Sequence, residues 1–314
     1  MALDFRNKFS WSFSRHKTFN ECLRRYYYTY YGSWGGWNED GPEEARLAYR
    51  FKCMTSMPMW LGDLVHRMAE RILSDASNAE LNSLESYQKQ LRHWMNTEYI
   101  KSVEKKWAKS PKHNLNLFEH YYGTEIDAEN RAAAREKVFR CLEHFLCSPL
   151  FERLTRLKPA EWKSIEKLDS FEVEGAPVYV KIDCATQADG VLSIYDWKTG
   201  AVTTDTETQL ACYARYAFER WHVPLDKQRL ISYYLDANEV QEHIPSADEL
   251  VEVKDFIIAS MGQMIERLDS GMRDNKASIT NFPMTETQWV CKRCFFRELC
   301  YKTRNWPPDV PVSE

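Results

Sequence analysis

One short stretch of this chain of 314 residues constrains its fold more than any other. Asp189-Gly190 stands between two runs of alternating and β-branched residues within 178–199, and an Asp-Gly pair in that setting is a strong signal for a two-residue β-hairpin. Counting outward from such a turn along both strands places Asp183 directly opposite Asp196. Opposed residues point to the same face of a sheet, with Cβ atoms about 4.5–5.5 Å apart. The sequence therefore predicts two carboxylates side by side.

Two like charges in this position repel each other, and a folded protein keeps them only with a compensating charge or a shifted pKa. A hard divalent cation such as Mg²⁺ or Mn²⁺, which prefers carboxylate oxygens and water, supplies that charge. Lys198 lies two residues beyond Asp196, so the strand period places it on the same face. Glu166, on the strand before the hairpin, is a weaker candidate for a further ligand. The alternative is a solvated hairpin face on which Asp and Lys pair weakly in water.

Two neighbouring helices carry further candidates. Gln209 and Tyr213 are spaced i, i+4 on a helix expected to follow the hairpin directly, so they share one face. His66 lies on an earlier amphipathic helix, where Glu70 on the same face is interpreted as a surface acid. Taken alone, His66 is better explained as a buried, hydrogen-bonded core histidine.

The order of the expected elements is that of an α/β protein. Helical spacing comes first, strand alternation follows, and the end of the chain is too irregular for either period. We expect helices at 11–31, 61–73, 84–109, 127–147, 205–222 and 247–270, three antiparallel strands within 162–199, two short strands at 229–235 and 239–244, loops at 32–42 and 110–123, and a cysteine-rich tail at 282–308.

The composition fits a globular protein, with 44% apolar and 28% charged residues. Its longest apolar stretches are far shorter than the roughly 18 residues of a membrane helix, and its first residues show no apolar core of a signal peptide. We therefore expect no membrane partner and a location in the reducing cytoplasm. There the nine cysteines are interpreted as free thiols or metal ligands, since disulfides are rare in that compartment.

Taken together, these residues resemble the PD-(D/E)XK nuclease superfamily, and most of all its RecB-like branch, which includes the CRISPR adaptation nucleases. The likeness runs from Ser12 to Cys300, with 74–160 matching poorly. Two departures are Val180, where the family usually has glycine, and Leu23, where it usually has proline. The motifs, in the family's order, are Gly62-x-x-x-His66, Ile182-Asp183, Asp196-Trp197-Lys198-Thr199-Gly200 and Gln209-x-x-x-Tyr213.

The resemblance implies a restriction-endonuclease-like core, in which helices flank a mixed central sheet, with a cysteine-ligated cluster joining the two ends of the chain. It implies a single nuclease domain over 1–314, with a helical insertion or cap at 74–160, the catalytic sheet and helix at 161–245 and a cluster-binding tail at 282–308.

The same resemblance assigns roles to individual residues. His66, Asp183, Asp196 and the Trp197 carbonyl would bind the Mg²⁺ or Mn²⁺ ion. Lys198 would be the catalytic lysine. The last motif, Gln209 and Tyr213, would contact DNA or orient the catalytic groups.

Three cysteines of the tail, Cys291, Cys294 and Cys300, stand within ten positions of one another. Spacing alone does not separate a zinc site from an iron–sulfur cluster, because both take four thiolates. The resemblance implies a structural 4Fe–4S cluster with Cys22 as its fourth ligand. The remaining cysteines are expected to pack as small core residues: Cys53, Cys141, Cys147, Cys184 and Cys212.

A formal net charge of −4 conceals two basic segments. Residues 1–31 carry six basic against two acidic side chains, and residues 291–304 carry five against one. A cluster joining both ends would make these segments neighbours, beside an aromatic run of which about half should pack inward. Basic side chains among aromatic ones suit single-stranded nucleic acid. The residues are Arg6, Lys8, Arg15, Lys17, Arg24, Arg25, Lys292, Arg293, Arg297, Lys302 and Arg304, with Tyr26, Tyr27, Tyr28, Tyr30, Tyr31, Trp34 and Trp37.

The leading interpretation is a metal-dependent DNA nuclease, an exonuclease on single strands or DNA ends, in repair, recombination or CRISPR- or phage-related processing. The alternative is a nuclease-fold subunit that holds DNA or assembles with a helicase or an integrase. A partner fits either interpretation, because the chain has no phosphate-binding Gly-x-x-x-x-Gly-Lys loop of its own. A third option is a four-cysteine zinc protein of unrelated function.

Overall fold

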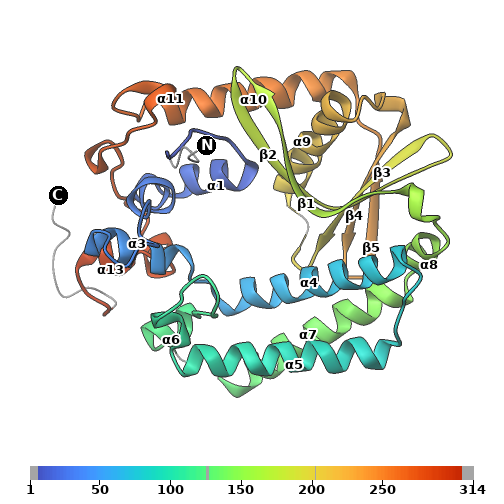
Figure 1. The fold of residues 1–314 in the computed structure, drawn as a ribbon, viewed down its shortest axis with the longest axis horizontal. Coiled ribbons are helices and arrows are strands. Elements are labelled where there is room, and N and C mark those ends of the chain that lie inside the picture. The colour runs from blue at the N-terminus through green and yellow to red at the C-terminus, as the bar shows by residue number, and fades with distance from the viewer. Residues whose placement is uncertain (1–5, 125–126, 202, 306–314) are drawn as a thin grey trace. The chain divides into compact units, whose positions relative to one another are not determined.

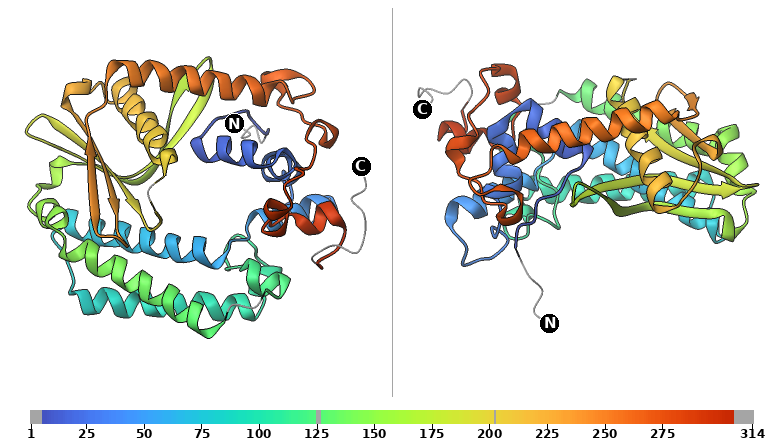
Figure 2. Two further views of the ribbon diagram at one scale, coloured as in Figure 1. Left: turned by 180° about the vertical axis from the view of Figure 1, so that it is seen from behind. Right: turned by 90° about the horizontal axis from the view of Figure 1, so that it is seen from above.

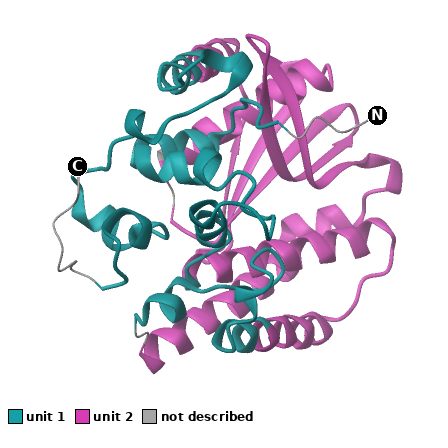
Figure 3. Cartoon of the chain, turned by 60° about the vertical axis from the view of Figure 1, so that its left-hand side comes forward, with its two compact units in different colours: residues 1–57, 98–125, 258–314 teal, residues 58–97, 126–257 magenta. Residues whose placement is uncertain are grey.

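The computed structural model describes residues 6–124, 127–201 and 203–305 (Figure 1). The chain divides into two compact units, each assembled from segments that are far apart in the sequence (Figure 3). Unit 1 comprises residues 1–57, 98–125 and 258–314, and unit 2 comprises residues 58–97 and 126–257.

Unit 2 is built on a five-stranded sheet with the strand order β1-β2-β3-β4-β5. The pair β3·β4 is parallel and the other pairs are antiparallel, so the sheet is mixed, as expected (Figure 2). A parallel pair needs a crossover, and the helix α9 (Thr204–Arg220) supplies it. The strands are β1 (Trp162–Val173), β2 (Ala176–Ala188), β3 (Val191–Lys198), β4 (Gln228–Tyr234) and β5 (Glu239–His243).

The register of the central hairpin is the predicted one. Ala188 pairs with Val191 across the turn, whose two residues have φ angles of 50° and 75°, as a type I′ turn requires. The ladder runs back to Cys184 opposite Tyr195. Asp183 and Asp196 are therefore the next pair in this register.

Helices cover both faces of the sheet. On one face α9 packs against β1, where the Tyr216 hydroxyl donates to Asp169 at 2.9 Å. On the other, α7 (Ala128–Cys147) places Phe145 edge-on to Trp197 of β3, with ring centroids 5.1 Å apart. Because side chains alternate along a strand, the residues on either side of Trp197 point to the face that α9 covers.

The remaining helices of unit 2 lie partly in the segment 74–160 that was expected to be helical. The helix α4 (Met57–Ser77) contacts α5 (Leu84–Val103) through the Tyr87 hydroxyl, which donates to Asp75 at 2.9 Å. In turn α5 contacts α7, with the Arg92 guanidinium 5.3 Å from the centre of the Phe139 ring. The short helix α8 (Pro149–Thr155) then leads into β1 through the turn η3 (Pro159–Glu161).

In unit 1 the prediction of one continuous helix over 11–31 was wrong, because the backbone is extended at Cys22. The break separates α1 (Phe13–Glu21) from α2 (Leu23–Tyr27), which continues into the π-helical turn η1 (Tyr28–Gly32). The helix α3 (Glu43–Lys52) was not expected. Its signals are the preceding proline, glutamates in its first turn and basic residues in its last turn.

An aromatic core joins the two ends of the chain within unit 1. Tyr28 stacks on Phe296 with ring centroids 5.6 Å apart, and the Arg24 amide donates to the Pro283 carbonyl at 3.2 Å. The core also includes Phe51, Trp107, Phe118, Tyr121, Phe295 and Leu299. The further elements of the chain are η2 (Lys106–Ala108), α6 (Phe118–Tyr122), η4 (Leu225–Lys227), α10 (Ala247–Ile265), α11 (Gly271–Asp274), η5 (Ile279–Asn281), α12 (Gln288–Lys292) and α13 (Arg297–Tyr301).

Several expected boundaries differ from the observed ones. The helix expected at 84–109 ends at Val103, because Lys105 adopts a left-handed φ of 55°. The helix expected at 247–270 ends at Ile265. The last residues of the predicted tail, 306–308, lie outside the described residues. No helix in the described part of the chain is both long enough and apolar enough to span a membrane.

Candidate active site

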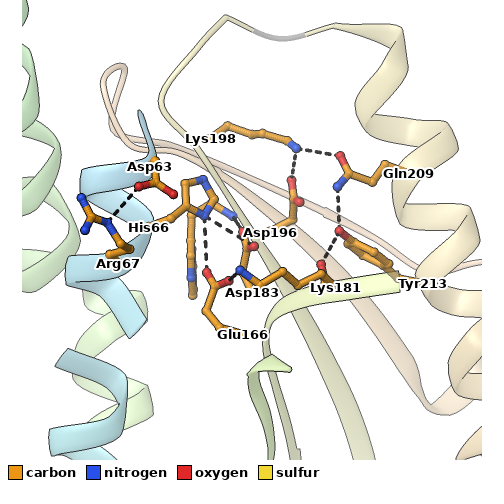
Figure 4. A network of polar contacts seen from close by, with 11 residues as sticks. Asp63, His66, Arg67, Glu166, Lys181, Asp183, Asp196, Lys198, Gln209 and Tyr213 are labelled. Atoms are coloured by element: carbon orange, nitrogen blue, oxygen red, sulfur yellow. Dashed lines mark hydrogen bonds and ion pairs between the residues drawn. The ribbon is translucent and has the colours of Figure 1, made fainter. Parts of the chain in front are cut away.

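The two carboxylates predicted from the hairpin meet on the α9 face of the sheet (Figure 4). Asp183 and Asp196 are both buried, at 7% and 2% exposure. Asp183 Oδ2 accepts a hydrogen bond of 2.7 Å from the Trp197 amide, which holds the side chain in place. Burial, and then the neighbouring Asp183 charge, raise the pKa of Asp196. The protein thus contains the electrostatic conflict that the sequence predicted.

His66 reaches this pair from α4. Its Nδ1 atom lies 3.5 Å from Asp183 Oδ1 and 3.5 Å from Glu166 Oε1 (Figure 4). Gly62, one turn earlier on α4, explains the first motif, because a Cβ there would lie only 3.2 Å from Thr199 Oγ1. The glycine lets the helix approach the loop that follows β3.

Glu166 is a larger part of this site than the sequence analysis inferred. Three side chains each place one possible metal-ligand atom within 4.8 Å of the other two: Glu166, His66 and Asp183. Among the described residues, no other set of three or more His, Cys, Asp or Glu side chains is this close. Glu166 has a φ of 50° within β1, a strained conformation for a residue with a side chain and one that is concentrated at functional sites. Asp183 faces it in the register of β1 and β2.

A signal for Glu166 was present in the sequence. The turn between β1 and β2 is Glu174-Gly175, and its residues have φ angles of 49° and 74°. Counting outward from this turn, as from Asp189-Gly190, places Glu166 opposite Asp183. Two successive hairpins therefore align Glu166, Asp183 and Asp196 on three neighbouring strands.

Lys198 is held at the other side of Asp196. Its Nζ lies 2.7 Å from Asp196 Oδ2 and donates to Gln209 Oε1 at 2.9 Å (Figure 4). Gln209 Nε2 in turn donates to the Tyr213 hydroxyl at 2.6 Å, which donates to the Lys181 carbonyl at 2.8 Å. The structure thus brings the last two predicted motifs together, with Gln209 and Tyr213 placed to orient the lysine.

A second cation, which the sequence analysis did not single out, is Lys181 on β2. Its Nζ lies 2.6 Å from Glu166 Oε2. Burial lowers the pKa of Lys181, but the Glu166 carboxylate outweighs burial and raises it. Burial would also lower the pKa of His66, yet Asp183 and Glu166 raise it to about 10. Three cationic groups thus offset three carboxylates.

These donors fit a hard divalent cation. The Glu166 Oε1 and Asp196 Oδ2 atoms are buried and accept no hydrogen bond from the described residues, although His66 and Lys198 lie within ion-pair distance of them. Carboxylate oxygens with one imidazole suit Mg²⁺ or Mn²⁺. The Trp197 side chain is fully buried in the sheet packing, and its carbonyl stays a predicted ligand. Glu70 is exposed, as inferred.

The four predicted cluster cysteines gather in unit 1. The pKa of Cys294 is raised to about 12, mainly by burial and to a smaller extent by nearby Cys22 and Cys291. The pKa of Cys300 is raised by burial and then by the other three thiols. Every described cysteine is free, and no three of these four sulfurs lie within 4.8 Å of one another. Cys22 lies at the break between α1 and α2, where the backbone is extended.

The other five cysteines were all expected in the core. Cys141, Cys184 and Cys212 are buried and Cys53 is half-buried, but Cys147 is exposed. The prediction was wrong for Cys147 because it is the last residue of α7, directly before the residue that caps α8.

Two arginines of the expected basic patch have internal roles. Arg15 is 4% exposed and donates to the Tyr26 and Tyr31 hydroxyls, and Arg297 is 6% exposed and lies 3.9 Å from the centre of the Tyr122 ring. The prediction that they contact phosphate was wrong, because their guanidinium groups stabilise the aromatic core. As expected, the aromatic run divides: Tyr26, Tyr28 and Tyr31 are buried, Tyr27 and Tyr30 are half-buried, and Trp34 and Trp37 are exposed.

A mixed sheet flanked by helices, with clustered carboxylates and an Asp-x-Lys pair at its centre, has the parts of a metal-dependent nuclease. The model of the PD-(D/E)XK nuclease superfamily matches residues 10–301. The chain belongs to this superfamily, and the family likeness inferred from its motifs is confirmed at that level. No curated protein matches the sequence.

Proposed function

We propose that this protein is a divalent-metal-dependent deoxyribonuclease of the RecB-like branch. The observation that carries the proposal is the close group of His66, Glu166 and Asp183, next to the buried Asp196 and its partner Lys198. Members of the superfamily are metal-dependent nucleases, and Mg²⁺ or Mn²⁺ is their usual ion.

The ion would be held by His66, Asp183 and Asp196, as the motifs imply, with Glu166 as a further ligand. When bound, it neutralises charge on the phosphate and makes water more acidic. His66 must lose its proton to serve as a ligand, since only neutral imidazole binds metal.

Lys198 acts on the phosphodiester itself. Its ammonium group is placed to stabilise the negative charge that develops on the phosphate oxygens. Gln209 Oε1 accepts a hydrogen bond from this group and is itself oriented by Tyr213, so the amine is held in one direction before substrate binds. Asp183, fixed by the Trp197 amide, keeps its other oxygen directed toward His66.

The mode of action we propose is exonucleolytic, on single-stranded DNA or DNA ends. Trp34 and Trp37 are 41% and 42% exposed on unit 1 and contact each other edge-on. Lys8, Lys292, Arg293 and Lys302 are exposed on the same unit. Exposed aromatic rings among cations favour unpaired bases, which can stack.

We further propose that Cys22, Cys291, Cys294 and Cys300 hold a 4Fe–4S cluster. Their mutual electrostatic influence supports one common site. The alternative is a zinc ion, which four thiolates also bind. The role of the cluster would be to join the N-terminal segment to the tail.

Digestion of end-labelled single- and double-stranded DNA with Mg²⁺ or Mn²⁺, after anaerobic purification, tests the nuclease. We expect Asp196→Ala and Lys198→Ala each to lower the rate by at least about 10²- to 10³-fold with unchanged circular dichroism. The matched controls are Asp226→Ala and Lys227→Ala, at exposed positions on η4. Full activity in either site variant would refute the assignment. DNA binding without cleavage by the parent protein would instead favour a DNA-holding subunit that works with a helicase or an integrase.

A further inference from the structure

A pocket of about 380 Å³ lies beside the catalytic carboxylates, between α9, β4, β5 and the start of α10. Pockets for small organic ligands span about 300–1,000 Å³, so this one suits a group the size of one nucleoside. Its lining includes Leu210, Leu230, Ser232 and Tyr234. None of these residues has a part in the chemistry described above.

The pocket adjoins the reaction site through the sheet register. Ser232 is the β4 partner of Asp196, and Tyr234 is the partner of Lys198. Neighbouring strands are about 4.8 Å apart, and paired residues share a face. The inner wall of the pocket therefore lies one strand away from the groups that would hold the scissile phosphate.

The lining selects the kind of ligand. Glu207, Glu242 and Glu249 carry carboxylates on its wall, of which Glu242 pairs with Arg229 and Glu249 with the lining residue His243. The carboxylates outnumber the cationic groups, so a phosphate is disfavoured and a neutral group is favoured. Leu210, Leu230 and Tyr234, none of them more than 7% exposed, form an apolar floor against which an uncharged planar group can pack.

One buried polar atom has no partner. Ser232 is 2% exposed, and its Oγ accepts or donates no hydrogen bond within the described residues. Leu230 and Tyr234, two residues to either side, also line the pocket, so the strand period directs Ser232 into it. A buried hydroxyl without a partner is costly, and a ligand that bonds to it removes this cost.

We propose that this pocket binds one nucleobase of the substrate strand, that of a nucleotide next to the scissile phosphate. This assignment depends on the nuclease activity proposed above. A base held there would fix the register of the strand, so that its phosphate lies over Asp196 and Lys198. Recognition would be by apolar contact with this floor and one hydrogen bond to the Ser232 hydroxyl.

The first test is a scan of single-stranded oligonucleotides in which one base at a time is replaced by an abasic site. We expect kcat/KM of the parent protein to fall about 10-fold or more at a single position, since the substrate would lose there one hydrogen bond and the apolar contacts of one base. Equal rates at all positions would overturn the assignment.

The second test fills the pocket. Ala211, a half-buried lining residue on α9, is changed to Phe, and Ala133→Phe on the exposed face of α7 is the control. We expect kcat/KM of Ala211→Phe to be about 10-fold below that of the parent protein on intact DNA. On the oligonucleotide that is abasic at the sensitive position, the two proteins should have equal kcat/KM. Ala133→Phe should behave as the parent protein on both substrates. If the losses in kcat/KM from Ala211→Phe and from the abasic position multiply, the two changes act at different places, and the proposal is contradicted. If circular dichroism shows that Ala211→Phe is unfolded, Ser232→Ala takes its place in the same comparison.

A third measurement separates failure of the pocket from failure of the nuclease. The fluorescence of 2-aminopurine, placed at each position of a bound oligonucleotide, is recorded with Lys198→Ala protein, which holds DNA without cutting it. A fluorescence change at one position of the oligonucleotide that disappears in the double variant Lys198→Ala/Ala211→Phe would support binding of a base in the pocket. This result would stand even if the parent protein cleaved no DNA. Cleavage by the parent with no such position refutes the pocket and leaves the nuclease intact.

Discussion

The carboxylate site of unit 2 and the cysteine group of unit 1 both gather groups that repel one another when ionised, but they do so in opposite ways. Around Asp183 and Asp196 the protein supplies cations: His66, Lys181 and Lys198. Around Cys294 and Cys300 it supplies burial, which raises the pKa of the thiols and keeps them neutral.

The difference indicates how each site would use a metal. Charged carboxylates that are paired with cationic side chains can exchange a hard ion with solvent without refolding. Buried neutral thiols must lose protons before they bind iron, and they then close a loop of most of the chain. If both groups bind as proposed, the ion in unit 2 would exchange with solvent and the cluster in unit 1 would remain bound.

Chelation is the strongest way to break this comparison. We expect EDTA to reduce DNA cleavage to background, because three carboxylates are then left without their ion, and added Mn²⁺ to restore it. The visible absorbance of the anaerobically purified protein should stay unchanged in the same sample. If EDTA removed both the visible absorbance and the activity, the metal in unit 1 would be as easily removed as the ion in unit 2.

Glu166→Gln tests the residue that the sequence offered only as a weaker ligand candidate and that the structure places within the site. We expect a loss of about 10²-fold in kcat, because the amide offers one weaker ligand oxygen and releases Lys181. Since the substitution also removes a like charge beside Asp183, the free energy of unfolding of the metal-free protein should not fall. Cleavage assays and urea unfolding measure the two effects. Unchanged kcat would limit Glu166 to a structural role.

Cys22→Ser should have the converse effect. We expect loss of the visible absorbance and a decrease of at least about 2 kcal/mol in the free energy of unfolding, by analogy with cross-links that close long loops. The matched control is Cys147→Ser at an exposed position, which should change neither. Full colour in Cys22→Ser would remove Cys22 from the ligand set.

The pH dependence of stability should give the smallest effect. Because the folded pKa of Cys294 is about 12 and that of an unfolded thiol is about 8.5, the folded state binds more protons between these values. The stability of the metal-free protein should therefore fall as the pH rises above about 8.5. The cluster-loaded protein, whose thiols are already deprotonated, should show a smaller slope, and so should metal-free Cys294→Ser. Urea unfolding at successive pH values measures the slopes, and equal slopes would contradict the neutral-thiol interpretation.

Much of the fold could be predicted because its signals are local. Asp-Gly and Glu-Gly turns set the register of β1, β2 and β3, and the alternation of side chains then decides which residues share a face. The predictions that failed concern features that the tertiary structure decides. The helix expected over 11–31 breaks at Cys22, although its apolar spacing continues, and Lys105 ends α5 through a backbone conformation that no composition signals.

Charge patterning was the least reliable guide. Arg15 and Arg297 belong to basic segments, yet both are buried against tyrosine rings. A guanidinium can bind a phosphate or stack on an aromatic face with the same chemistry, so only the packing of unit 1 distinguishes the two.

The sequence by itself determined the alignment of Glu166, Asp183 and Asp196, because two-residue turns transmit register along neighbouring strands without help from the rest of the chain. It also placed Lys198 beside Asp196 through the period of a strand. The tertiary structure alone decided that His66 closes this group from α4, that four cysteines from the two ends of the chain gather in one place, and that a pocket opens beside Ser232. These depend on contacts between segments far apart in sequence, where packing decides which side chains meet.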